Sequence, residues 1–209
     1  MVKHLIFFFA LVLIVANVYG QQEVNPFVQE VEDFQKELND HYKDRKKSPL
    51  TRKERRAFQG HRFYAINLTY RVYAQFERIE QEDTIVMATS SGGEKYYRPY
   101  AYVYFNIGTD TCRLTVYQSY RLRETKEYKD YLFIPFRDAT SGKTSYGGGR
   151  YLDILIPEGD MVLLNFNLAY NPYCAYTMGY NCTIPPEENT LKIAIKSGLM
   201  APEDHPEDH

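Results

Sequence analysis

Residues 96–120 read YYRPYAYVYFNIGTDTCRLTVYQSY. In the first half of this stretch, Ala101, Val103 and Phe105 alternate with Tyr102 and Tyr104, which is the two-residue period of a strand with one buried face. The glycine and aspartate at positions 108 and 110 are a turn signal, and a second alternating run follows them. The stretch therefore predicts an antiparallel hairpin.

The same alternation recurs along most of the chain. Counting the hairpin, about eight short strands are expected from about residue 62 onward, joined mostly by tight turns, and strands do not alternate with helices. This pattern excludes a doubly wound fold and predicts a mainly β domain, an antiparallel sandwich or barrel with one N-terminal amphipathic helix. The further strands are expected at 70–77, 84–89, 131–136, 150–156, 161–168 and 190–196.

A helix is expected at about residues 25–47. Asn25 can cap its first turn and Pro26 suits the first helical position. Apolar residues then recur at three- and four-residue spacing, and Ser48-Pro49 is a stop signal. The apolar stripe consists of Phe27, Val31, Phe34, Leu38 and Tyr42.

Both ends of the chain differ from the middle. Residues 1–20 combine Lys3, an apolar run and a small residue at Gly20, which is the pattern of a cleavable signal peptide. Residues 199–209 end in a doubled Pro-Glu-Asp-His repeat and are expected to form a disordered acidic tail. We therefore expect an exported protein, periplasmic or secreted, with a single domain at 21–198 and no transmembrane segment after cleavage.

Composition limits the partners. Lys and Arg number 25 against 27 Asp and Glu, a formal net charge of -2, so no basic field exists for nucleic acid. Nothing in the sequence indicates a cofactor, and the oligomeric state stays open. The aromatic content is unusual, with 20 tyrosines and no tryptophan.

Three cysteines leave one unpaired in an oxidising compartment. Cys112 lies on the buried face of a predicted strand and is interpreted as a small apolar residue. Cys174 and Cys182 lie in a loop-like stretch, and a disulfide between them is the preferred interpretation, with two free thiols as the alternative. No histidine lies near them to complete a metal site, and neither His41 nor His61 has a recognisable catalytic context.

The segment 133–151 is rich in small hydroxyls and glycines between two strands. Its glycines can let backbone N–H groups converge, and Arg150 can take an anionic oxygen. The favoured alternative is an internal network in which Asp138 caps the turn through Thr140 and Arg150 pairs with Asp138 or Asp153. The spacing of its Gly-Lys-Thr does not match a phosphate-binding loop of the Walker type.

The segment 165–189 is dense in asparagine and tyrosine. Amides and tyrosine rings at this density can bind polar ligands, including sugars. Asparagine side chains also satisfy loop backbone, which is the commoner use of Asn before Pro. Both readings remain open from the sequence.

Three blocks in these segments, FRDATSG at 136–142, YGGGRYLD at 146–153 and AYNPYCAY at 169–176, resemble the signature of the bacterial family catalogued as domain of unknown function 1684. The likeness spans most of residues 30–198, and a short exported form is typical of its Bacteroidetes branch. Asn165 departs from the family pattern, which has an aspartate there. The resemblance implies no activity. Relatives that lack a signal but keep the cysteine pair weaken the disulfide interpretation and raise the thiol or metal alternative a little.

The two segments lead to three hypotheses. The first is a non-catalytic exported β-domain that binds a small polar or anionic ligand or a glycan. The second is a hydrolase acting on an envelope component, with Asp138 as the acid or base. The third is a structural or interaction protein without a ligand. The ligand-binding candidates are Thr140, Thr144, Tyr146, Arg150, Tyr151, Asn167, Asn171 and Asn189.

Overall fold

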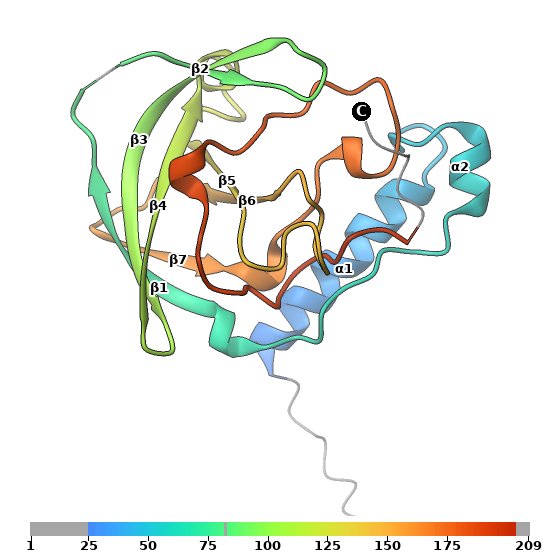
Figure 1. The fold of residues 1–209 in the computed structure, drawn as a ribbon, viewed down its shortest axis with the longest axis horizontal. Coiled ribbons are helices and arrows are strands. Elements are labelled where there is room, and N and C mark those ends of the chain that lie inside the picture. Colours follow the sequence, from blue (N-terminus) through green and yellow to red (C-terminus); the bar gives the residue numbers. More distant parts are fainter. Residues whose placement is uncertain (1–24, 82, 204–209) are drawn as a thin grey trace, which may run out of the picture.

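The computed structural model describes residues 25–81 and 83–203, so the predicted signal peptide and the end of the acidic tail lie outside the described residues. Seven strands form one antiparallel sheet, ordered β6-β5-β4-β3-β1-β7 with β2 also paired to β3, and the sheet curls into a half-barrel (Figure 1). The strands are β1 Arg71–Arg78, β2 Ile85–Ala88, β3 Glu94–Ile107, β4 Asp110–Ser119, β5 Tyr131–Phe136, β6 Arg150–Leu155 and β7 Met161–Asn165. The helices are α1 Pro26–Lys43, α2 Arg52–Ala57 and α3 Tyr120–Arg123, with 3-10 turns at Leu68–Tyr70, Phe166–Leu168, Tyr173–Ala175 and Glu187–Asn189.

The predicted fold class is confirmed, with its hairpin and its N-terminal helix. β3 and β4 form the hairpin and pair Phe105 with Cys112. One detail was not predicted: a bulge between Pro99 and Ala101 shifts the register of β3. Because a bulge changes which face later residues occupy, it brings Tyr97 to the same side as Tyr117, away from Ala101.

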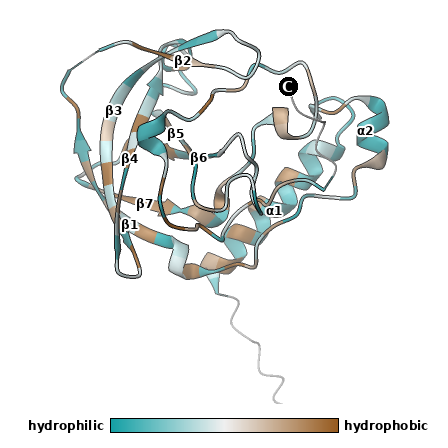
Figure 2. Cartoon of the chain, in the orientation of Figure 1, coloured by the Kyte–Doolittle hydropathy of each residue, from teal (hydrophilic) through white to brown (hydrophobic). Residues whose placement is uncertain are grey.

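The two faces of the sheet bury separate clusters. On β5, Leu132 and Ile134 enter the main core, whereas Phe133 points to the opposite face. The second cluster consists of Met87, Tyr97, Tyr117, Phe133 and Tyr151, and we call it the tyrosine cluster. Figure 2 shows the resulting alternation of hydrophobic and hydrophilic colour along the strands, while α2 is mainly hydrophilic.

Helix α1 begins as expected, because the Asn25 side chain accepts a hydrogen bond from Phe27 N and Pro26 occupies the first turn. It ends at Lys43, four residues before the expected boundary, because Asp44 turns the chain by accepting bonds from the N–H groups of Lys46 and Lys47. Val31 and Tyr42 are buried, so this part of the apolar stripe packs against the rest of the domain.

Two boundaries near the C-terminal end differ from expectation. The predicted strand at 190–196 is absent: this segment touches the sheet through one isolated bridge, between Thr190 and Arg137, and crosses the open side of the half-barrel (Figure 1). The packed chain also continues past residue 198, where the predicted tail begins. Leu199 is buried and its N–H donates to Ala169 O.

His61 lies in an aromatic cluster between α1 and the loop after β7. Its ring centroid is 4.3 Å from that of Tyr42 and 4.9 Å from those of Phe58 and Tyr176, and neither ring nitrogen has a hydrogen-bond partner. Burial, with a smaller contribution from His41, lowers the pKa of His61 to about 3. The folded protein therefore holds this imidazole neutral.

We expect His61 to make the protein acid-sensitive. Because its pKa is lower in the folded state than in the unfolded state, its contribution is complete above about pH 6.5 and is lost as the pH falls toward 3. Between pH 6.5 and 4.5 the loss should be about 2–3 kcal/mol. Urea unfolding of wild type and His61→Phe across this range measures it. Parallel pH profiles for the two proteins would contradict the prediction.

Candidate functional site

Asp138 and Arg150 form a buried ion pair. Their side chains are 0% and 1% exposed, and Arg150 NH2 lies 3.3 Å from Asp138 Oδ2. Asp138 also accepts bonds from the Thr140 hydroxyl at 2.8 Å and from the Ile195 N–H at 2.5 Å. Burial lowers the pKa of Arg150 and the adjacent carboxylate opposes that effect. The internal network, rather than an open anion site, is the arrangement found.

The same arginine holds the segment that was expected to be a strand. Arg150 NH2 donates to Ile195 O at 2.8 Å, and NH1 donates to the carbonyls of Ser197 and Leu199. Gly198 permits this path, since its φ is +76° and a Cβ there would lie 2.5 Å from Ala169 O. A charged side chain thus replaces the hydrogen bonds that a neighbouring strand would supply.

Asn189 joins two strands where they part. β4 and β5 are paired at Tyr117 and Phe133, and beyond that pair the Asn189 side chain fills the space between them. Its Oδ1 accepts from Thr115 N, and its Nδ2 donates to Thr115 O and Pro135 O, each at 2.8 Å. Asn189 therefore uses its amide group within the fold.

Asn167 plays a similar part at the other end of the sheet. Its Oδ1 accepts from Asn67 N at 2.9 Å and its Nδ2 donates to Asn67 O at 3.0 Å, so the side chain pairs with the backbone as a strand would. Asn165 supports it by accepting from Asn167 Nδ2. The Nδ2 of Asn165 is itself buried without a partner, a donor that the aspartate of the family pattern would not carry.

The two segments singled out from the sequence, 133–151 and 165–189, meet at the surface around a shallow hollow of about 810 Å³. Of the ligand-binding candidates, Tyr146 lines it. Thr144 lies apart, with its hydroxyl 2.6 Å from that of Tyr64, and Thr140 is buried against Asp138. The candidates are therefore not gathered in one cleft.

Cys174 and Cys182 are joined by a disulfide, with their Cα atoms 6.3 Å apart. Cys112 is a free, buried thiol. Burial, aided by Asp110, raises the pKa of Cys112, which keeps it protonated and unreactive. No described cysteine is thus available as a nucleophile.

A second pocket, of about 430 Å³, lies over the tyrosine cluster, and we call it the tyrosine pocket. Tyr97, Phe133 and Tyr151 form its sheet side, and the Phe133 and Tyr151 rings lie 4.7 Å apart at their centroids. Tyr151 donates to Thr183 O at 2.6 Å, which fixes the ring. The remaining lining residues come from α1, β3, α3, β5 and the chain after β7: Leu38, Tyr42, Lys95, Leu122, Tyr131, Tyr170, Asn171, Pro172, Tyr173, Tyr180, Asn181, Cys182, Thr183 and Leu199.

Two polar groups of the pocket wall lack partners. The ammonium group of Lys95, on β3, forms no hydrogen bond or ion pair with any described residue, and burial together with Arg121 lowers its pKa. Asn171 is buried and donates to Tyr176 OH and Met200 O, but its Oδ1 accepts nothing. The pocket therefore offers a positive charge and an unused acceptor.

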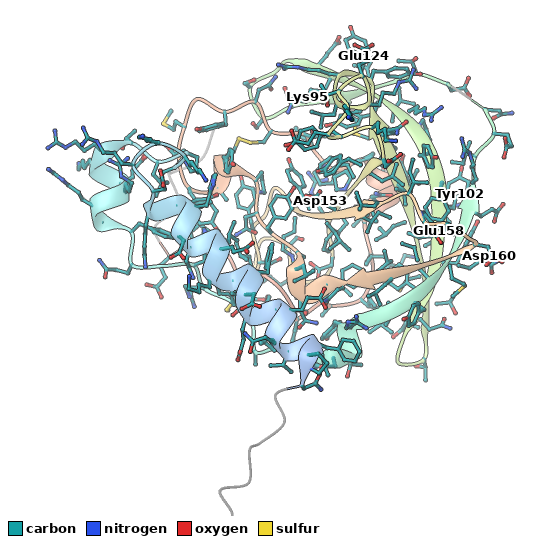
Figure 3. All side chains as sticks on the ribbon, turned by 180° about the vertical axis from the view of Figure 1, so that it is seen from behind. Lys95, Tyr102, Glu124, Asp153, Glu158 and Asp160 are labelled. Carbon is teal, nitrogen blue, oxygen red and sulfur yellow. A yellow bond between two sulfur atoms is a disulfide. The ribbon has the colours of Figure 1, made fainter. Side chains whose placement is uncertain are left out.

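Asp153 lies beside this pocket on β6, directly across from Phe133. In Figure 3 it lies over the middle of the view, whereas Asp160 is at the edge of the molecule. Tyr131 OH donates to Oδ1 at 2.6 Å and Tyr170 OH to Oδ2 at 2.9 Å. Burial raises the pKa of Asp153 against the opposing effect of these two hydroxyls, yet the side chain remains accessible to solvent. This carboxylate is therefore partly desolvated but accessible to a ligand.

The accessible side of Asp153 faces a second hollow, of about 510 Å³, between the free ends of the sheet at β6 and β7. We call it the edge hollow. Its walls are mostly apolar, and Glu30 of α1 is also a lining residue. The complete lining is Glu30, Tyr131, Leu152, Asp153, Ile154, Leu155, Val162, Leu163, Asn165 and Leu168.

Sequence reasoning named Tyr151 and Asn171 but missed Lys95, Tyr97 and Asp153 as site residues. Tyr97 reaches the pocket because of the bulge, which has no clear mark in the sequence. Asp153 did carry a signal, since it interrupts the apolar run of a strand whose first three residues are buried. A charged residue in such a run indicates a partner or a cavity.

Within residues 25–81 and 83–203, no cluster of three or more His, Cys, Asp or Glu side chains is arranged to hold a metal ion. In the same residues no helix is long and apolar enough to cross a membrane.

Comparison with known proteins supports the resemblance noted from the signature blocks. No curated protein gives a significant match. A solved structure does: the solution NMR structure of an uncharacterized protein from Haloarcula marismortui is 29% identical, with a TM-score of 0.66 over 86% of this chain and 97% of that one. The model of the family described as "Protein of unknown function (DUF1684)" matches residues 56–200, well over half of the chain. With its signature residues holding the half-barrel together, the chain belongs to the DUF1684 family.

Proposed function

We propose that this protein binds a small anionic molecule with an aromatic or sugar-ring body in the tyrosine pocket. The observation that carries the proposal is the Lys95 ammonium group, partly desolvated and unpaired in a wall made largely of aromatic rings. A carboxylate or similar group on a ligand would compensate this charge. The rings of Tyr97, Phe133 and Tyr151 offer stacking surface to a flat body.

The pocket has the size and stiffness of a ligand site. A volume of about 430 Å³ lies within the usual range for small-molecule pockets. Its sheet side is built on β3, β5 and β6, and the loop opposite is held by the Cys174–Cys182 disulfide and by the bond from Tyr151 to Thr183. A wall held in this way loses little entropy when a ligand binds.

Other functions have less support. Catalysis by Asp138 would need an open carboxylate, but this one is buried and occupied by Arg150, Thr140 and Ile195. A purely structural role accounts for Arg150, Asn167 and Asn189, but it leaves the unpaired Lys95 without a purpose.

We further infer that the protein is exported, periplasmic or secreted, as in the Bacteroidetes-type members that it resembles. The apolar run after Lys3 and the disulfide between Cys174 and Cys182 support this, because disulfides persist in oxidising compartments.

Titration with 3-phenylpropionate and its neutral counterpart 3-phenylpropanol tests the proposed pocket. We expect the anion to bind more tightly than the alcohol and to perturb tyrosine absorbance. Lys95→Met should lower the affinity for the anion about tenfold, because it removes a charge-assisted contact. Lys192→Met, at an exposed lysine outside the pocket, should leave binding unchanged. Glucuronate against glucose provides the same comparison for a sugar ring.

Leu122→Trp provides a second test, because Leu122 lines the pocket and a larger side chain there should block it. Val86→Trp, at an exposed residue of β2, is the matched control. Binding that survives Leu122→Trp, or the absence of any response to all four compounds in wild type, would refute the proposal.

A further inference from the structure

The edge hollow differs from the tyrosine pocket in the sign of its charge. Its charged lining residues are Glu30 and Asp153, and no lysine, arginine or histidine of the described chain lines it. Glu30 lies 3.7 Å from Arg71 in a half-exposed pair. Asp153 forms no ion pair with any described residue. The hollow therefore holds one carboxylate whose charge is not balanced.

Two tyrosine hydroxyls satisfy the hydrogen bonding of Asp153 without neutralising it. Tyr131 and Tyr170 each donate to one carboxylate oxygen, and burial beside Asp153 raises the pKa of both phenols, so they remain protonated donors. They hold the carboxylate in one orientation. Asp153 is partly desolvated and has no counter-charge, so a bound cation would compensate its negative charge.

The walls indicate which kind of cation fits. Leu155 is 67% exposed, and Ile154, Val162, Leu163 and Leu168 continue the apolar surface. A metal ion prefers several oxygen ligands, and residues 25–81 and 83–203 hold no cluster of three or more acidic, histidine or cysteine side chains for one. An ammonium group on a hydrocarbon body matches both the carboxylate and the walls. The Tyr131 ring adds a surface that attracts cations.

Asn165 provides an independent indication of a ligand. This residue lines the hollow and is 4% exposed, yet its Nδ2 donates to no described atom. Buried donors in native proteins are almost always paired. An oxygen atom on the bound molecule would give this amide its partner.

We propose that the edge hollow binds an organic cation, with its ammonium group on Asp153 and its hydrocarbon body against Leu155 and Val162. This site is distinct from the tyrosine pocket and takes a ligand of the opposite charge. Tyr131 lines both, so the two sites share one wall. The proposal does not depend on the tyrosine pocket being occupied.

Hexylammonium and its neutral counterpart 1-hexanol test the proposal, with methyl resonances of Leu155 and Leu163 as the readout at neutral pH. We expect hexylammonium to shift these resonances in a saturable way and to bind at least tenfold more tightly than hexanol. Asp153→Asn should remove that preference, while Asp160→Asn, an exposed aspartate at the far end of β7, should retain it. Choline against 3,3-dimethylbutan-1-ol repeats the comparison for a ligand that also carries an oxygen.

Leu155→Lys keeps the test decisive if Asp153→Asn fails to fold. This position is already exposed, so the substitution should be tolerated, and its ammonium group should repel the cation and abolish binding. Leu155→Gln is the uncharged control. Equal binding of hexanol and hexylammonium, or no shift at either leucine, would overturn the proposal. The phenylpropionate titration at Lys95 would be unaffected by that result.

Discussion

Arg150→Met is expected to destabilise the protein by about 3–5 kcal/mol, enough to leave much of it unfolded at 37 °C. The substitution leaves the Asp138 carboxylate buried without its counter-charge, and it removes the donors to Ile195, Ser197 and Leu199. Urea unfolding followed by circular dichroism measures the loss.

Two comparisons identify the cause. Lys36→Met breaks a shorter ion pair, the 2.7 Å contact with Asp40, but on the surface, and should cost far less than Arg150→Met. Asp138→Asn combined with Arg150→Met should cost less than the sum of the single substitutions, because no unpaired charge remains. A loss below 1 kcal/mol for Arg150→Met would show that the pair is dispensable.

Asn189→Leu is expected to be nearly as damaging, at about 3–6 kcal/mol. Leucine has a similar volume, but it leaves Thr115 N, Thr115 O and Pro135 O without their present partner between β4 and β5. The cost follows from unpaired backbone groups at a site that is 0% exposed. Thermal unfolding would measure the loss of stability, and faster amide exchange at Thr115 would show that its N–H has lost its acceptor.

Asn106→Leu is the matched control, since Asn106 is exposed near the tip of the β3–β4 hairpin. It should change stability by no more than about 0.5 kcal/mol. If Asn189→Leu behaved like this control, the gap between β4 and β5 would be bridged by something other than the asparagine side chain.

Much of the fold could be predicted because it follows from local alternation. In β3, Ala101, Val103 and Phe105 are buried in alternation with less buried neighbours, and that period is visible without any tertiary information. β4 departs from the pattern, because it is buried at every position from Leu114 to Gln118. The same reasoning wrongly predicted a strand at 190–196. Its apolar residues, such as Leu191 and Ile195, do enter the main core, but its backbone is bonded by Arg150 and Asp138, which lie far away in sequence.

The site was harder to predict for a related reason. Arg150, Asn167 and Asn189 have the chemistry of ligand-binding residues, but their polar groups are already hydrogen-bonded to backbone atoms that are distant in sequence. Lys95 and Asp153 looked ordinary in sequence. They matter because folding leaves each of them partly covered and without an opposite charge, and only three-dimensional proximity decides that.

The contacts of Arg150 also set an order of events during synthesis. The backbone groups that it binds, at residues 195–199, are made after every strand of the half-barrel. Until they emerge from the ribosome, Arg150 lacks these carbonyl acceptors, Asp138 lacks the Ile195 N–H donor, and the open side of the sheet has no cover. The half-barrel therefore remains incomplete until residues 195–199 have been made.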